Sequence, residues 1–315
     1  MPKKKSLTLQ RVLVLLLAYI MLAVCGGVAA SVLFVPGVVG ANKAAKAVIP
    51  SLKVENVDFD VTSLPQKSTM YARDGSTVIA TFYNQHRIVV PLKKISKTMQ
   101  QAVVAREDRR FWTHAGVDVQ GVMRAFVQTY LVKGSQQGGS SLTQQYVKNV
   151  LLMQAIEDDD SIAQYHATED TIARKIREML ISVQMEKKYS KAEILQGYLN
   201  IAQFGNNLYG VETAAQRYFS VSAADLNVVQ SATIAAITKN PSLYDPLVEE
   251  NQKESENQRN IVLKLMLQEG YITQKQYTEA VNTPLKDTLK VQDVNVGCQD
   301  TGDYAYFCDF VVHRI

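Results

Sequence analysis

The chain has 315 residues, a formal net charge of +4 and 47% hydrophobic residues. It is long enough for one large domain or two modest ones, and apolar enough for a proper core, which excludes a disordered chain. The basic residues are spread along the sequence rather than gathered into a patch, so nucleic-acid binding is disfavoured. With three cysteines and no CxxC, His-rich or HExxH pattern, the sequence offers no support for a zinc site.

The segment Val12–Val35 contains no charged residue. As a helix it would be roughly 36 Å long, against a hydrocarbon core of about 30 Å, so we predict a transmembrane helix. Lys3–Lys5 and Arg11 precede it without an acidic residue, which places the short N-terminus in the cytoplasm and exports the rest. A cleaved signal peptide is the alternative, because Val28–Ala30 suits a signal peptidase, but the apolar stretch is longer than the usual cleavable core.

The first element expected after the membrane segment is a β-hairpin over Ser68–Tyr83, since β-rich arms flank Asp74-Gly75, a pair suited to a tight turn. Beyond it, apolar residues recur at helical spacing, and Asn240-Pro241 ends the last such helix. We therefore expect a mainly α body. The apolar faces comprise Ile95, Met99, Ala102 and Val103; Ile172, Ile176, Met179 and Val183; Leu195, Leu199 and Ala202; and Leu226, Val229, Thr233 and Ile237.

Two segments lack clear periodicity, the glycine-rich 134–139 and the acidic 154–170, and both are predicted to be mobile surface loops. Cys298 and Cys308 lie close together on the exported side, where a disulfide is permitted, and two unpaired thiols are equally consistent with the sequence. The predicted organisation is a cytoplasmic N-terminus (1–11), a transmembrane helix (12–35), a stalk (36–66), a catalytic domain (67–285) and a C-terminal linker (286–315).

Three polar blocks stand out, and each has an ordinary structural explanation when taken alone. Glu107–Gly116 combines an acid, an aromatic and an imidazole, but a glutamate at a helix end usually caps or is solvated. Gly138–Asn149 brings hydroxyls and amides into a helix start, as in any N-capped helix. Arg174–Glu178 fits a solvated ion pair. Further blocks are Lys191–Asn200, Phe204–Asn207, Gly210–Glu212 and Lys239–Ser242.

Taken together and in order, these blocks closely resemble family 51 glycosyltransferases, the polymerase domain of class A penicillin-binding proteins and of monofunctional peptidoglycan polymerases. The resemblance covers Thr69 to Met266 and follows the patterns ED-x-x-F-x-x-H-x-G, G-x-S-T-x-x-QQ-x-x-KN, RK-x-x-E and K-x-x-IL-x-x-YLN. The chain departs from the family in two places: the usual Ser-Thr pair is Ser140-Ser141, and the acidic segment before Arg174 looks inserted.

The resemblance implies a mainly α, lysozyme-like glycosyltransferase domain with a small β-hairpin that polymerises lipid II into β-1,4-linked glycan and releases undecaprenyl diphosphate with inversion. Glu107 would be the general base, and Glu178 a second catalytic glutamate. The residues expected to bind the substrate or its diphosphate are Ser141, Gln145, Lys148, Asn149, Arg174 and Lys175. Those expected to shape the site are Asp108, Phe111 and His114.

The implied partners are lipid II, the growing lipid-linked glycan, the plasma membrane and other cell-wall synthesis proteins. No cofactor is obligatory, although Mg²⁺ or Mn²⁺ is a possible aid, and moenomycin is the implied inhibitor. The segment Val117–Val132 corresponds to a region that leans on the membrane in the family, and an ordinary buried helix is an equal alternative.

Two other functions remain as alternatives. A lysozyme-like enzyme would cleave finished glycan, but the basic RKxxE block and the membrane span argue against it. An inactive scaffold of the cell-wall machinery would not need its charged site residues. The end of the chain resembles the linker to a transpeptidase domain, yet neither Ser-x-x-Lys nor Lys-Thr-Gly occurs, so we expect no penicillin binding by these residues.

Overall fold

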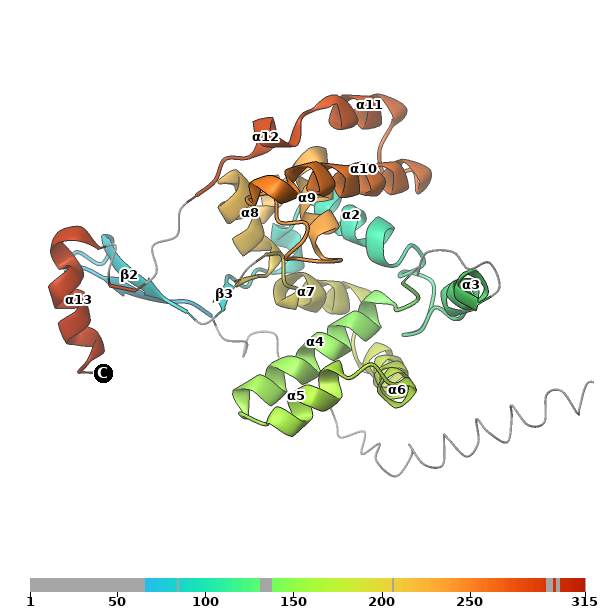
Figure 1. Cartoon of the computed structure of the whole chain (residues 1–315), viewed down its shortest axis with the longest axis horizontal. Coiled ribbons are helices and arrows are strands. Elements are labelled where there is room, and N and C mark those ends of the chain that lie inside the picture. The colour runs from blue at the N-terminus through green and yellow to red at the C-terminus, as the bar shows by residue number, and fades with distance from the viewer. Residues whose placement is uncertain are drawn as a thin grey trace, which may run out of the picture. The chain divides into compact units, whose positions relative to one another are not determined.

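The computed structural model describes residues 66–83, 85–130, 138–205, 207–292, 297–298 and 301–314. This part of the chain is mainly helical, which confirms the expected class (Figure 1). The helices are α2 (Lys97–Glu107), α3 (Val119–Tyr130), α4 (Leu142–Glu157), α5 (Ser161–Thr168), α6 (Ile172–Lys188), α7 (Lys191–Ile201), α8 (Val211–Phe219), α9 (Val228–Ile237), α10 (Gln252–Gln268), α11 (Gln274–Asn282), α12 (Leu285–Thr288) and α13 (Ala305–Val312). The strands are β1 (Ser68–Tyr71), β2 (Val78–Phe82), β3 (His86–Arg87) and β4 (Leu208–Tyr209).

The predicted transmembrane segment Val12–Val35 and nearly all of the predicted stalk lie outside the described residues. Among the helices that are described, none combines the length and the apolar character needed to cross a bilayer. The transmembrane helix therefore remains a prediction.

The β-hairpin forms where the sequence predicts it. Strands β1 and β2 pair antiparallel, with Ser68 opposite Phe82. Between them, the carboxylate of Asp74 accepts hydrogen bonds from the backbone amides of Ser76 (2.9 Å) and Thr77 (2.8 Å), and Gly75 has a φ of +67°. Asp74 therefore stabilises the turn through its side chain, and Gly75 adopts the positive φ that the turn requires without strain.

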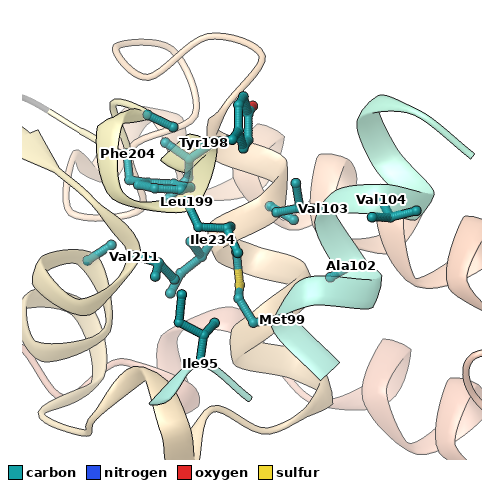
Figure 2. Close-up of a cluster of buried hydrophobic side chains, with 14 of the residues drawn as sticks. Ile95, Met99, Ala102, Val103, Val104, Tyr198, Leu199, Phe204, Val211 and Ile234 are labelled. Atoms are coloured by element: carbon teal, nitrogen blue, oxygen red, sulfur yellow. The ribbon is translucent and has the colours of Figure 1, made fainter. Parts of the chain in front are cut away.

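The main core is built by helices α2, α7, α8 and α9. Figure 2 shows Met99 and Val103 of α2 together with Leu199 of α7 and Ile234 of α9, and all four are fully buried. Helix α10 runs along α9 on the side away from α7 (Figure 1). The predicted apolar faces of α2, α7 and α9 are thus the faces that pack, and together they fix the C-terminal ends of α2 and α9.

Helix α4 crosses α7 at close range, and Gly197 makes this approach possible. A Cβ atom at Gly197 would lie 2.3 Å from Cζ of Tyr146 on α4. Tyr146 is itself buried, so its ring has little room to move away. The position of α4 relative to the core depends on this glycine.

The acidic segment 154–170 was predicted to be a mobile loop, and this prediction is wrong. Helix α4 continues to Glu157, and α5 follows after a short turn in which Asp159 has a φ of +51°. Asp160 caps α5 by accepting from the amides of Ile162 (3.0 Å) and Ala163 (2.9 Å). The aspartates that interrupt the apolar pattern are therefore helix-boundary residues. Figure 1 shows α5 folded back alongside α4.

Cys298 and Cys308 form a disulfide, which decides between the two alternatives that the sequence left open. Cys308 of α13 is fully buried, in a small apolar cluster with Ile79 and Ala80 of the hairpin. This cluster is separate from the main core. The disulfide thus strengthens a second, small packing unit made of the hairpin and α13.

Candidate active site

Glu107 is the last residue of α2, and its carboxylate is held from two sides. Nε2 of Gln145 on α4 donates to Oε2 (2.8 Å), and the hydroxyl of Thr238, just after α9, donates to Oε1 (2.7 Å). Each carboxylate oxygen therefore has one donor, and its remaining lone pair is open for another hydrogen bond. The side chain is half-buried, so it is fixed in direction but still reachable.

Gln145 is itself oriented by the core. The hydroxyl of Tyr198 on α7 donates to Oε1 of Gln145 (3.1 Å), which turns the amide nitrogen toward Glu107. Burial raises the pKa of Tyr198 well above its usual value, and the nearby charge of Glu107 adds to this effect, so the hydroxyl remains a donor. The expected substrate-binding residue Gln145 thus has a second use, which is to position the candidate base.

Asp108 follows Glu107 and connects the loop after α2 to the start of α4. Its Oδ2 atom accepts from the backbone amide of Leu142 (3.0 Å) and lies 2.7 Å from Nε2 of His114. Leu142 is the first residue of α4, so the carboxylate satisfies one of the free amides at that helix end. Asp108 and His114 therefore contact each other through largely buried side chains, and their expected role in shaping the site stays a prediction.

Phe111 lies behind this pair, fully buried, and contacts the partly buried side chain of Lys191 at the start of α7. The ammonium of Lys191 lies 4.5 Å from the centroid of the Phe111 ring and donates to Oε1 of Glu186 (2.7 Å). The same oxygen accepts from the hydroxyl of Thr143 on α4 (2.5 Å). These contacts tie α4, α6 and α7 together beneath the site.

Ser141 is the N-cap of α4, and its hydroxyl is used within the fold. It accepts from the amide of Gln144 (3.2 Å) and donates to the carbonyl oxygen of Gly116 (2.6 Å). Gly116 has a φ of +85°, and a Cβ there would lie 2.7 Å from the backbone of Ser182 on α6. Ser141 is buried as a result, and its expected role in substrate binding stays a prediction.

The RKxxE block forms a compact ion cluster at the N-terminal end of α6. Glu178 is only 2% exposed; Oε1 accepts from Nη1 of Arg174, and Oε2 accepts from the ammonium of Lys175 (2.9 Å). Nε of Arg174 donates to the carbonyl oxygen of Glu169, at the end of α5. The carboxylate expected to organise the basic residues therefore contacts two of them directly.

Ser140 also belongs to this cluster, because its hydroxyl accepts from Lys175 (3.1 Å). In the Ser140-Ser141 pair, the first hydroxyl thus faces the cations while the second caps the helix. The sequence directed attention to Ser141 alone, and only the hydrogen bonds distinguish the two.

Lys148 on α4 is the third cation of the cluster. Burial lowers its pKa, the charges of Arg174 and Lys175 lower it further, and Glu178 opposes them. Within the part of the chain that the structure describes, its ammonium makes no hydrogen bond or ion pair, and neither does the side chain of its neighbour Asn149. Three cations thus surround one carboxylate, which leaves an excess of positive charge at a half-buried position.

Helix α4 connects the two halves of the site. Gln145 reaches Glu107, and Lys148, three residues later, reaches the ion cluster. Residues three apart lie on one helix face, with Cβ atoms roughly 5–6 Å apart. The acid and the cations therefore line one surface.

Beside the site, the start of α3 exposes apolar side chains. Val119 is 67% exposed, Met123 is 60% exposed, and Trp112 in the preceding loop is 50% exposed. Val119 and Met123, in the first part of the segment Val117–Val132, are therefore exposed, and contact of this segment with the membrane stays a prediction.

The described residues do not suit a divalent cation at this site. No group of three or more acidic, histidine or cysteine side chains gathers there within the described ranges. Both oxygens of Glu178 already accept from Arg174 and Lys175, so this carboxylate is not available as a ligand. We derive no step through a metal.

Thr238 is the site residue that sequence reasoning missed. It lies beside the flagged block Lys239–Ser242, but a threonine after a helix has no distinctive pattern. Its contact with Glu107 joins residues 131 positions apart and appears only once α2 and α9 are packed together.

The Transglycosylase family model matches residues 75–267, so the chain belongs to this family, which supplies the glycosyltransferase domain of class A penicillin-binding proteins. Among its relatives, it is similar to penicillin-binding protein 4 of Bacillus subtilis (39% identity, covering 76% of this chain and 36% of the relative). It is equally similar to penicillin-binding protein 1A of Aquifex aeolicus (39% identity, 70% and 28%). The chain spans only about a third of the length of these relatives.

A crystal structure of penicillin-binding protein 1A from Haemophilus influenzae also matches. The identity is 24%, the TM-score is 0.43, and the match covers 80% of this chain and 25% of that one.

Proposed function

We propose that the chain polymerises lipid II into β-1,4-linked glycan strands at the outer face of the plasma membrane. The observation that carries this proposal is the arrangement along α4. Gln145 on this helix holds the carboxylate of Glu107, and Lys148, one turn further on, lies in a cluster with an excess of cations. The first suits a base, and the second suits a departing diphosphate. The family match to a transglycosylase supports the same reaction.

In this mechanism Glu107 removes the proton from the acceptor sugar's 4-hydroxyl. The oxygen attacks C1 of the donor sugar from the face opposite the diphosphate, so the new O–C1 bond forms as the C1–O bond to phosphate breaks. The bonding electron pair leaves with the undecaprenyl diphosphate, and an α-linked donor becomes a β-linked glycan. Glu107 later releases the proton to solvent.

The cations stabilise the charge that develops on the leaving group. Lys148 has no carboxylate partner of its own in the described residues, and Arg174 makes its described hydrogen bonds through Nε and Nη1. Lys148 and the Nη2 group of Arg174 therefore supply donors for phosphate oxygens. Because the diphosphate leaves as a stabilised anion, it needs no carboxylic acid to protonate it, unlike the leaving group of a glycosidase.

The lipid part of the substrate places the site beside the membrane. Val119, Met123 and Trp112 form an exposed apolar surface that suits this position, and the predicted helix Val12–Val35 would anchor the chain. The growing glycan and other cell-wall synthesis proteins are the further partners proposed.

The decisive experiment is polymerisation of labelled lipid II by the detergent-purified full chain. Wild type is compared with Glu107→Gln and with a control, Glu250→Gln, which changes an exposed glutamate just before α10. Long glycan made by wild type and control, lost in Glu107→Gln and blocked by moenomycin, supports the proposal. Cleavage of finished glycan would identify a lytic enzyme, and no reaction by folded wild type would favour a scaffold.

A further inference from the structure

The hydroxyl of Thr238 lies between two acceptors, and the hydroxyl of Tyr198 is a further hydrogen-bonding neighbour. Oγ1 is 2.7 Å from Oε1 of Glu107 and 2.8 Å from the carbonyl oxygen of Ala235, one turn back in α9. A hydroxyl has one proton, so it donates to only one of them at a time. A hydrogen bond to an ionised carboxylate is about twice as strong as one between neutral groups. While Glu107 is ionised, the proton therefore points toward Glu107.

We propose that Thr238 is a positioning residue for Glu107 whose hydroxyl adapts to both protonation states of the carboxyl group. This rests on the proposed function, in which Glu107 takes a proton in each transfer. Once protonated, Glu107 is a weaker acceptor, and the Thr238 proton turns to the Ala235 carbonyl. Oγ1 then accepts the O–H of the neutral carboxyl group. One side chain satisfies both states, with no movement of the backbone.

The location of Glu107 explains why such a partner matters. It is the last residue of α2, and Thr238 directly follows α9, so two helix C-termini meet at the carboxylate. The C-terminal end of a helix carries partial negative charge, which opposes an ionised carboxylate nearby. The Thr238 hydroxyl on one oxygen and the Gln145 amide on the other offset this effect.

The backbone after α9 holds Thr238 firmly. Thr238 keeps a helical conformation (φ −53°, ψ −31°), and the amide of Asn240 donates back to Ile237 (3.1 Å). The carbonyl of Asn240 then accepts from the amide of Tyr244 (3.0 Å), whose side chain is buried. Thr238 therefore lies in a hydrogen-bonded turn, and this turn fixes the direction of Oγ1.

A purely structural role is the competing explanation, because threonine hydroxyls often bond a carbonyl one turn back in a helix. Thr233 provides a matched control. Its hydroxyl donates to the carbonyl of Val229 (2.9 Å) in the same helix, it is fully buried, and no described contact joins it to Glu107. Replacing each threonine by valine removes the same group and keeps the same shape.

The experiment measures steady-state lipid II polymerisation by the full chain for Thr238→Val, Thr238→Ser and Thr233→Val. We expect Thr238→Val to lower kcat by about 10- to 100-fold, the effect of losing a hydrogen bond to a charged group, with KM changed less than about twofold. Thr238→Ser should stay within about threefold of wild type, as should Thr233→Val. Wild-type kcat in Thr238→Val, or equal losses in the serine and valine variants, would overturn the inference.

A second measurement separates this inference from the proposed function. In protein labelled with ¹³C at the glutamate carboxyl carbon, the Glu107 resonance is the one missing from Glu107→Gln. We expect it to shift in Thr238→Val and to remain in place in Thr233→Val, whether or not the protein polymerises lipid II. An unchanged resonance would overturn the contact, whereas an inactive wild type with a shifted resonance would overturn only the proposed function. If Thr238→Val melts below the assay temperature, Thr238→Ala replaces it in both measurements.

Discussion

Arg174 and Glu178 lie one turn apart on α6, and the guanidinium of Arg174 donates directly to Oε1 of Glu178. Lys175 occupies the other oxygen, so the buried carboxylate holds two cations in place while neutralising only one charge. The cluster is therefore stable and still positively charged.

Replacing Glu178 by glutamine tests this dual role. The variant keeps the shape but leaves Arg174 and Lys175 without their anion, next to Lys148. We expect a loss of about 3 kcal/mol in the free energy of unfolding, as for other broken buried pairs, and at least a tenfold lower polymerisation rate. Urea denaturation and lipid II turnover measure the two effects. Glu250→Gln, at an exposed position, should change neither, and an equally stable Glu178→Gln protein would contradict the pairing.

Lys148 is expected to oppose stability while supporting activity. Its pKa is lowered mainly by burial, which means that the fold holds the charged form at a cost. Lys148→Met should therefore raise the melting temperature, by roughly a few degrees, and reduce turnover at least tenfold. Thermal melting and lipid II polymerisation are the measurements, with the exposed Lys264→Met as the control. A destabilised Lys148→Met protein would show that the ammonium has a partner after all.

The same lowered pKa predicts a pH dependence. As pH rises, Lys148 loses its proton at a lower pH than an ordinary lysine, so its help to the leaving group disappears earlier. The cost of holding the charge also disappears, so stability rises through the same window, from the lowered folded pKa up to the unfolded value. Lys148→Arg keeps its charge at every accessible pH. We expect the ratio of wild-type to Lys148→Arg activity to fall as the pH rises toward the lowered pKa of Lys148, and a constant ratio would refute it.

Gly197→Ala tests the contact between α4 and α7. Its methyl group would meet the ring of Tyr146, and overpacking of this kind costs typically about 1–3 kcal/mol. Gly138→Ala is the matched control, because nothing lies within 4 Å of its added Cβ. Chemical denaturation measures both. Equal stabilities for the two variants would mean that Tyr146 moves aside freely.

Loss of the disulfide should affect only the smaller packing unit. The cluster of Cys308, Ile79 and Ala80 is separate from the main core. We expect Cys308→Ser to speed amide hydrogen exchange in β1, β2 and α13, and to leave α2, α7 and α9 protected as in wild type. Cys298→Ser should behave in the same way. Faster exchange throughout the protein would show that the two clusters unfold together.

The elements with a clear local cause were predictable from the sequence. Asp74-Gly75 produced the hairpin turn, and regular apolar spacing produced α2, α7 and α9. Helix α6 also forms, but its predicted apolar face is wrong, because Ile172 is 79% exposed whereas Arg174 and Glu178 are buried. Helix α5 was missed because its acidic residues suggest solvent-exposed coil, whereas Asp160 caps the helix, Ala167 is buried and the helix packs against α4. Charge alone does not separate a loop from a helix boundary.

The contacts of the site that lie within one helix were predictable from the sequence, and those between helices were not. Arg174, Lys175 and Glu178 are close in sequence, so their meeting follows from one helix turn. The partners of Glu107 come from α4 and from the end of α9, and their contacts arise only from packing. The structure also shows that Ser141 and Gln145 hydrogen-bond within the fold, which no spacing pattern reveals.

The bare α-carbon of Gly116 lets the loop after α2 pack against α6. The loop that begins beside Glu107 presses directly on the backbone of α6 there, with no side chain in between, and Ser141 fastens it from α4. Any side chain at position 116 would push this loop away from α6 and pull it against the hydrogen bond from Ser141. The connection between the helix that carries Glu107 and the helix that carries Arg174 and Glu178 therefore depends on a residue with no side chain.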